Sequence, residues 1–114
     1  PMPQAPALHP SEVLFWLELG GTAVRQDFPA ELRRVCGGAQ GLIIGRSHQQ
    51  QLHCEALNDE VAQYISREHF RVERSGAGGD FCVVPMASNL MWLLRGSGRV
   101  AMRSNDPTQL CSGD

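Results

Sequence analysis

The chain has 114 residues, 42% of them apolar, and a formal net charge of −2 at neutral pH. This length and apolar fraction predict a single folded domain and exclude a disordered chain. The longest apolar run is too short to cross a bilayer. Because the chain is slightly acidic and its arginines do not form a run, we expect neither a nucleic-acid partner nor a membrane surface.

The N-terminal segment is rich in proline and lacks the basic start and the apolar stretch of a secretion signal. We therefore expect residues 1–11 to be a linker or an expression remnant and residues 12–114 to be the domain. The cysteines are widely spaced, with no C-x-x-C pair. They are Cys36, Cys54, Cys82 and Cys111. These features predict reduced thiols in an intracellular protein, either cytoplasmic or nuclear.

The sequence predicts strands along most of the domain. Apolar runs bounded by turn residues lie at 13–19, 42–44, 70–73, 81–84, 90–94 and 100–102. Residues 75–80, which are rich in glycine, predict the loop of a hairpin. Short strands at close intervals, separated by turn signals, predict an all-β fold with the architecture of an antiparallel β-sandwich. Trp16 and Trp92 lie within these runs and are expected in its core.

Two segments are not simple strands. Residues 28–35 are ambiguous, because three apolar side chains fit helical spacing but the segment is short and contains a proline. In residues 57–65, apolar side chains again fall at helical spacing, with Asn58 as a candidate N-cap. The polar residues before them predict a loop. The Arg46–Ser66 segment is therefore expected to be a long loop that holds a short helical turn.

Three short polar islands lie where predicted strands meet loops. They are Gly45-Arg46-Ser47, Ser66-Arg67-Glu68-His69 and Ser88-Asn89. Together they supply guanidinium groups, hydroxyls, a carboxamide and backbone N–H groups. Arginine offers a fixed fork of donors, and charge-assisted hydrogen bonds to phosphate are about twice as strong as neutral ones. The islands therefore predict a site for a phosphate ester rather than for bond-breaking chemistry.

The order of the islands resembles the pattern of the forkhead-associated (FHA) domain family, which is G-R, then S-x-x-H, then an S-N-G-type turn. In this chain the pattern reads Gly45-Arg46, Ser66 to His69, and Ser88-Asn89. The resemblance extends from about Val13 to the C-terminus. It implies an FHA/SMAD-like β-sandwich that binds phosphothreonine peptides of a partner protein through loops at one end, with no catalytic residues, no metal and no cofactor.

The resemblance also implies which residues contact the peptide. Arg46 would contact the phosphate or the peptide backbone beside it, and Ser66 would donate its hydroxyl to the phosphate. Arg67 would offer its backbone N–H, with its side chain as a further donor. Asn89 would hold the peptide backbone next to the phosphothreonine. The full set of binding candidates is Arg46, Ser47, Ser66, Arg67, Ser88 and Asn89.

Two further residues are implied to support the site without contacting the ligand. Gly45 would permit a tight approach of the loop, and His69 would brace the binding loops from within. Taken alone, Arg46 would be read as a surface residue at a strand end, and Ser66 as a turn or capping residue. Only the order of the islands favours a role in ligand binding for both of them.

The chain departs from the family pattern at three places. Leu90-Met91 follows Asn89, where the family has Gly-Thr, and leucine resists the positive φ that glycine permits. The Arg46–Ser66 stretch is longer than usual. Residues 110–114 resemble a segment that normally precedes the last strands. These departures favour an alternative: an FHA-like module whose interactions do not need phosphate, with unpaired sheet edges that could form a homodimer.

Two other kinds of site receive little support from the sequence. His48, His53, Cys54 and His69 could be considered as zinc ligands, but their spacing matches no standard zinc site. A hydrolase built on Ser66 and His69 would lack the G-x-S-x-G nucleophile elbow. The chain is therefore expected not to be an enzyme.

Overall fold

The computed structural model describes residues 8–75, 80–88, 90–111 and 113–114. Within these ranges the chain is mostly β, as predicted, with eight strands in antiparallel sheets. The strands are β1 (Phe15–Glu18), β2 (Arg34–Gly37), β3 (Leu42–Ile44), β4 (Phe70–Arg74), β5 (Phe81–Pro85), β6 (Met91–Arg95), β7 (Gly98–Met102) and β8 (Thr108–Gln109). The helices are α1 (Gln50–Ala56) and α2 (Asp59–Ala62), and the 3₁₀ turns are η1 (Pro10–Glu12) and η2 (Ala30–Leu32).

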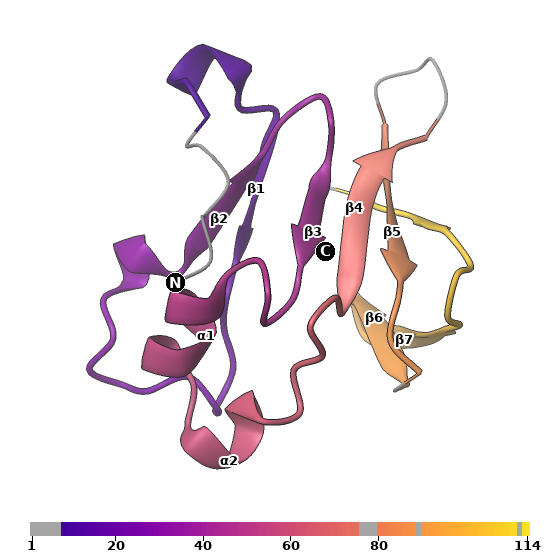
Figure 1. The fold of residues 1–114 in the computed structure, drawn as a ribbon. Helices are drawn as coiled ribbons and strands as arrows, with labels where there is room; N and C mark the ends of the chain where they lie inside the picture. The colour runs from indigo at the N-terminus through magenta and orange to yellow at the C-terminus, as the bar shows by residue number, and fades with distance from the viewer. Residues whose placement is uncertain (1–7, 76–79, 89, 112) are drawn as a thin grey trace.

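A four-stranded sheet in the order β3-β4-β5-β8 runs through the middle of the fold (Figure 1). Its register places Ile44 opposite Phe70, and Phe70 opposite Pro85. Because neighbouring strands are antiparallel, β3 and β5 end where β4 begins. The three polar islands follow β3, precede β4 and follow β5. Strand pairing alone therefore gathers the islands at one end of this sheet.

Two further sheets have two strands each, β1–β2 and β6–β7. The ring of Phe15 in β1 lies 4.7 Å from the ring of Phe81 in β5, measured between centroids. Leu93 in β6 and Met102 in β7 form a buried cluster with Val83 in β5. Phe81 and Val83 are two residues apart and so point to the same face of β5. Both two-stranded sheets therefore pack on the same face of the four-stranded sheet.

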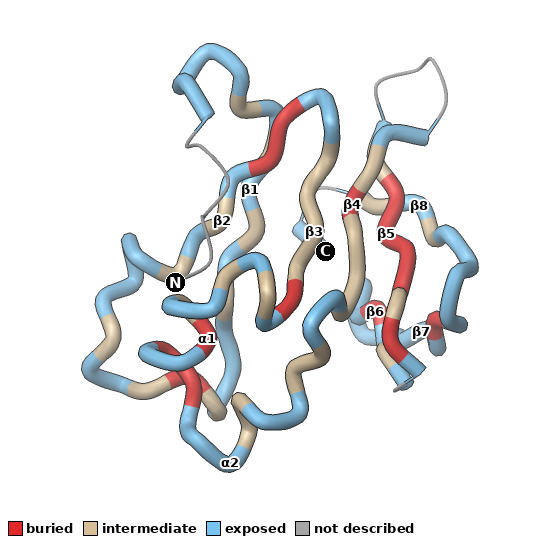
Figure 2. The backbone as a smooth tube through the Cα atoms, viewed as in Figure 1, coloured by how far each residue is buried: buried red, intermediate tan, exposed pale blue. Residues whose placement is uncertain are grey.

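The core is concentrated on the central strands. Val72 in β4, and Val83 and Val84 in β5, are almost completely buried. Figure 2 shows the longest buried stretch along β5, whereas β6 and β7 are mostly exposed. Since β5 is apolar on both faces, it reads as a continuous apolar run in the sequence rather than as an alternating one.

The long loop between the first two islands is folded around a small cluster of its own. The N–H of Arg25 donates to the carbonyl of Ala56 at 2.7 Å, and the N–H of Asn58 donates to the carbonyl of Ala23 at 3.1 Å. These bonds attach the junction of α1 and α2 to the segment that precedes η2. Buried side chains fill the space between them: Val24, His53, Ala56 and Leu57.

Several predictions about local structure were incomplete. The ambiguous residues 28–35 form η2 and enter β2, a strand that the sequence pattern did not indicate. The polar segment after Ser47 was expected to be a loop, but it contains the first residues of α1. The predicted helical turn is α2, which starts after Asn58, although the Asn58 side chain makes no capping hydrogen bond. No helix in the described ranges is long and apolar enough to span a membrane.

The prediction that both tryptophans are in the core was wrong. Trp16 is 52% exposed and Trp92 is 44% exposed. Each indole is covered instead by a guanidinium from the paired strand, Arg34 at 4.2 Å and Arg99 at 4.5 Å from the ring. Within each strand the inward positions are taken by the neighbouring residues, such as Phe15 and Leu93, so the tryptophans point outward.

The remaining features of the fold are the two ends of the described chain and the cysteine thiols. Residues 8–11, within the segment expected to be a linker, enter η1, and residues 1–7 lie outside the described ranges. Near the C-terminus, Arg95 of β6 forms an ion pair with Asp114. The arginine and the Cys111 N–H lower the pKa of this carboxyl to about 2. Cys82 is buried, whereas the other three cysteines are exposed, and all four are free thiols.

Candidate functional site

Backbone hydrogen bonds join the first two islands side by side. The N–H of Arg46 donates to the carbonyl of Ser66 at 2.9 Å, and the N–H of Ser47 donates to the carbonyl of Arg67 at 3.1 Å. At the start of β4, the N–H of His69 donates to the carbonyl of Ile44 at 2.7 Å. These bonds continue the β3–β4 ladder beyond the strands. The Arg46 and Ser66 loops are therefore held in a fixed relative position.

Gly45 lies where the two loops approach most closely. It is buried, and a Cβ atom at this position would collide with the carbonyl oxygen of Arg67 and lie 2.8 Å from the Cα of Glu68. Both neighbours are backbone atoms, which cannot move aside as the tip of a flexible side chain can. Only glycine therefore allows this contact between the loops.

His69 forms hydrogen bonds within the second island and with the segment that leads to the third. Burial lowers the pKa of its imidazole, which favours the neutral ring. The ring Nδ1 accepts a hydrogen bond from the N–H of Ser66 at 3.2 Å. The carbonyl of His69 accepts bonds from the N–H groups of Met86 and Ala87, at 2.9 and 3.2 Å. One residue thus fixes the start of the Ser66 loop and the chain that leads to Ser88.

The third island is only partly described. Ser88 is exposed and follows Ala87, which is buried. The predicted peptide-binding residue Asn89 lies outside the described residues. Leu90, at the position where the FHA pattern has glycine, is 64% exposed. The structure therefore places Ser88 beside the other two islands through its backbone neighbours, and the prediction for Asn89 stays a prediction.

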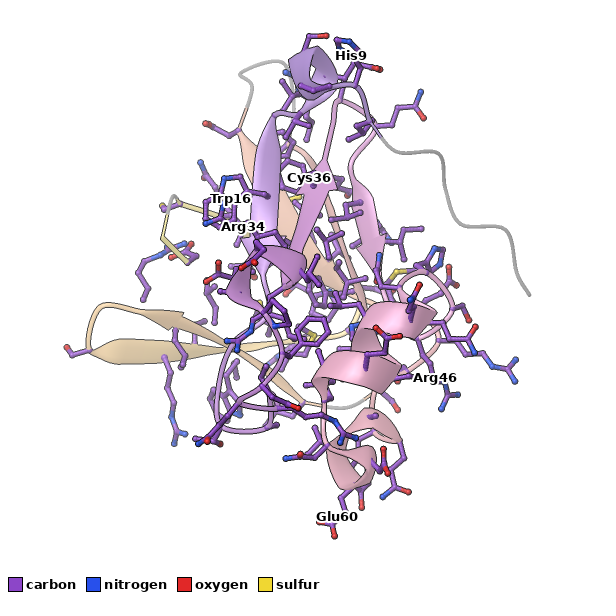
Figure 3. The ribbon with its side chains drawn as sticks, turned by 90° about the vertical axis from the view of Figure 1, so that its left-hand side faces the viewer. His9, Trp16, Arg34, Cys36, Arg46 and Glu60 are labelled. Carbon is purple, nitrogen blue, oxygen red and sulfur yellow. The ribbon has the colours of Figure 1, made fainter. Side chains whose placement is uncertain are left out.

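The gathered loops present several donors that no described residue uses. Arg46 and Arg67 are exposed, and neither guanidinium forms a hydrogen bond or an ion pair within the described ranges. The hydroxyls of Ser47 and Ser66 are half-buried and equally free of partners there. Figure 3 shows Arg46 at the surface beside α1. The backbone N–H groups of Arg46 and Ser47 are occupied by the opposite loop, so the side chains and the Arg67 N–H remain as donors.

One acidic group lies among these donors. Glu68 is exposed, and its Oε2 lies 3.2 Å from Nε2 of His48, which follows the first island. This contact draws the carboxylate toward His48. When the imidazole is protonated the contact is an ion pair, and it partly offsets the negative charge that would oppose an anionic ligand.

Gln49 is a supporting residue that the sequence did not reveal. Its Oε1 accepts from the N–H of Gly45 at 3.0 Å, and its Nε2 donates to the carbonyl of Ile43 at 2.8 Å. The side chain therefore satisfies the backbone just where β3 ends and the Arg46 loop begins. Nothing in the sequence distinguishes Gln49 from Gln50 and Gln51, which follow it.

A second histidine is buried behind the site. His53 of α1 is 4% exposed, and its Nδ1 has no hydrogen-bond partner within the described residues. Burial lowers its pKa, and the charge of His69 lowers it further. The His69 imidazole thus lies close enough to influence the protonation of His53. Among the described residues no group of three or more His, Cys, Asp or Glu side chains is arranged to hold a metal ion.

Comparison with protein-family models, with curated proteins and with solved structures gave no significant match to this chain.

Proposed function

We propose that this chain is an FHA-like, non-catalytic module of the cytoplasm or nucleus that binds phosphothreonine in a partner protein. The observation that carries the proposal is the pair of backbone hydrogen bonds between the Arg46 and Ser66 loops, with Gly45 beneath them. These bonds bring a guanidinium and two hydroxyls, none of which has a partner among the described residues, to the same end of the sheet. Such a group of donors suits a doubly charged phosphate ester.

The charge of the ligand fits this group of donors. Phosphothreonine carries about −1.5 to −2 charges near neutral pH and has three acceptor oxygens. Arg46 supplies a fork of donors, Ser47 and Ser66 supply hydroxyls, and Arg67 supplies a backbone N–H. Because this set is small, it requires no basic surplus, which agrees with the net charge of −2. Ser88 and Asn89 are proposed to hold the peptide backbone beside the phosphate.

The arrangement of the sheets supports an FHA-like β-sandwich as the finer description of the fold. The two-stranded sheets pack through Phe15 and Leu93 on the same face of the four-stranded sheet, which gives two layers. In this proposal β1–β2 and β6–β7 are two parts of one second layer. The binding loops then lie at one end of the sandwich, as loops do in sandwich domains that bind ligands.

Calorimetric titration with a phosphothreonine peptide library tests the proposal. We expect binding that is lost when the threonine is not phosphorylated. Arg46→Ala and Ser66→Ala should each weaken it, the arginine variant by about 1.5–3 kcal/mol because it removes a charge-assisted contact. Arg74→Ala is the matched control, since Arg74 is an exposed arginine at the opposite end of β4. Equal affinity for the unphosphorylated peptides would reject the proposal.

A second function is favoured by the exposed face of the β6–β7 sheet. Leu90 and Leu94 are 64% and 65% exposed, and Trp92 lies between them on the same face. Within the described ranges, β6 and β7 pair only with each other, so both have a free edge. These features suit a phosphate-independent interaction or dimerisation module. Light scattering at high protein concentration tests for dimers, and Trp92→Ser should abolish any that form.

A further inference from the structure

A pocket of about 380 Å³ lies between α1 and the segment that contains η2 and the start of β2. Four apolar side chains contribute to its lining: Phe28, Leu32, Val35 and Leu52. The other lining residues are polar or charged: Arg34, His48, Gln49, Gln51 and Glu55. The pocket thus combines an apolar portion, which can bury an apolar side chain, with polar groups that can contact a peptide backbone.

The extra residues after Arg46 build one wall of this pocket. Gln51, Leu52 and Glu55 belong to α1, which exists only because the chain is long between the first two islands. The opposite wall comes from η2 and from β2. On that side Leu32 is 58% exposed, which is high for a leucine that lines a pocket. The pocket is therefore open to solvent on the side of Leu32.

The pocket and the proposed phosphate site share a wall. His48 lines the pocket, and its Nε2 contacts the carboxylate of Glu68, which belongs to the second island. Gln49 also lines the pocket, and it holds the backbone of Gly45 through the hydrogen bond to its N–H. The His48–Glu68 contact and the Gln49–Gly45 hydrogen bond therefore connect the lining of the pocket to the first two islands.

We propose that this pocket receives a large aliphatic or aromatic side chain of the same phosphopeptide. The inference rests on the proposed function. It adds that the bound peptide carries an apolar residue a short distance from the phosphothreonine. Transfer of a side chain of this size from water into the pocket strengthens binding roughly tenfold or more. The exposed edge of Leu32 would be covered in the complex, while Arg34 and Glu55 would face the polar backbone of the peptide.

Peptide-binding affinities of the variants Leu32→Ser and Leu52→Ser test this inference. The phosphothreonine peptides carry leucine or glycine at each flanking position in turn. We expect one flanking position at which leucine raises the affinity of the wild-type protein roughly tenfold. Both variants should abolish that preference and leave the affinity for the glycine peptides unchanged. Leu94→Ser is the matched control, because Leu94 is a comparably exposed leucine on β6.

The outcomes separate this inference from the function on which it rests. If phosphopeptides bind and Arg46→Ala weakens binding, but no flanking leucine matters or the two serine variants keep the preference, the pocket is not a subsite and the phosphate site stands. If leucine peptides bind equally without phosphate, the pocket acts alone and the linked subsite is wrong. If no phosphopeptide binds, both proposals fail.

Discussion

At the scale of single residues, the candidate site depends on groups that support the loops from behind. Gly45 permits two backbones to touch, and His69 accepts a hydrogen bond that only a neutral Nδ1 can accept. The donors proposed to bind phosphate, Arg46 and Ser66, are exposed or half-buried and make few contacts of their own. Substitution of a supporting residue should therefore reduce both stability and binding, whereas substitution of a donor should reduce binding alone.

Gly45→Ala should destabilise the protein and weaken phosphopeptide binding together. The added methyl group meets the backbone of Arg67 and Glu68, and forcing extra atoms into a packed contact costs about 1–3 kcal/mol of unfolding free energy. Urea unfolding measures this cost. Gly20→Ala is the matched control, because nothing lies within 4 Å of a Cβ there. A Gly45→Ala protein as stable as the control would contradict the close contact between the loops.

Acidification should destabilise the protein through two histidines whose pKa is lowered, the buried His53 and the half-buried His69. The folded state lowers the pKa of both His53 and His69 below 6.5, because burial disfavours the charged ring. As the pH falls through 6.5, the unfolded chain binds protons that the folded chain does not bind. The free energy of unfolding should therefore be constant above this pH, as far as these two groups determine it, and should decrease below it.

Urea unfolding from about pH 7.5 to about pH 5 tests this dependence. His53→Leu should reduce the slope, since it removes one of the two histidines with a lowered pKa, and it should cost little stability because Nδ1 of His53 has no partner in the described structure. The same slope in the variant and in the wild type would show that His53 does not contribute.

At the scale of secondary structure, the strands were easier to predict than the segments between them. The sequence predicted β3, β4 and β5 nearly to the residue, because glycine, proline and polar islands bound each apolar run. It missed β2 and α1, because their stability comes from partners distant in the chain. β2 is a strand because it pairs with β1, and α1 is held by side chains such as Gln49 and by the Arg25 bond to Ala56.

The sequence also did not predict which face of a strand points toward the core. The run around Trp16 is apolar at successive positions, and an apolar run does not reveal which of its two faces points inward. The structure turns Phe15 toward Phe81 and Trp16 toward solvent. The same ambiguity affected Trp92 beside Leu93. An arginine on the paired strand, such as Arg34 or Arg99, is the feature that accompanies each exposed indole.

Gln49→Ala should loosen the connection between β3 and α1. The variant loses two hydrogen bonds to half-buried backbone groups, at Gly45 and Ile43, which predicts a loss of about 1–3 kcal/mol in unfolding free energy. Binding of phosphopeptides should weaken with it. Gln50→Ala is the matched control, because Gln50 is the exposed neighbour at the start of α1. Thermal unfolding of both variants provides the comparison, and equal melting temperatures would contradict the role of Gln49.

At the scale of the whole molecule, the candidate site is a product of topology. The islands are about twenty residues apart in the chain, and no local pattern shows that they meet. They meet because the register aligns Ile44, Phe70 and Pro85 across three strands. The sequence could predict the residues of the islands and their position at strand ends, but their convergence depends on long-range pairing. The same pairing leaves β1–β2 and β6–β7 as separate sheets on one face.

The division of the fold into a four-stranded sheet and two separate two-stranded sheets predicts that local stability differs between them. The four-stranded sheet contains Val72, Val83 and Val84, which are almost completely buried, whereas β6 and β7 pair only with each other within the described ranges. Elements with few buried contacts open before the whole chain unfolds. In native-state hydrogen exchange at low denaturant, amides of β4 and β5 should therefore exchange last, and those of β6 and β7 should exchange through a local opening.

Substitution of two adjacent leucines in β6 tests whether the β6–β7 hairpin opens separately from the four-stranded sheet. Leu93 is 7% exposed and packs against Val83, whereas Leu94 is 65% exposed. Leu93→Ala should cost about 2–5 kcal/mol and should lower the protection of β6 and β7 more than that of β4. Leu94→Ala should change neither, because its side chain stays in water in the folded state. If Leu93→Ala lowered protection equally in all strands, the fold would open as one cooperative unit, and the two-stranded sheets would be as tightly coupled to the central sheet as its own strands are to each other.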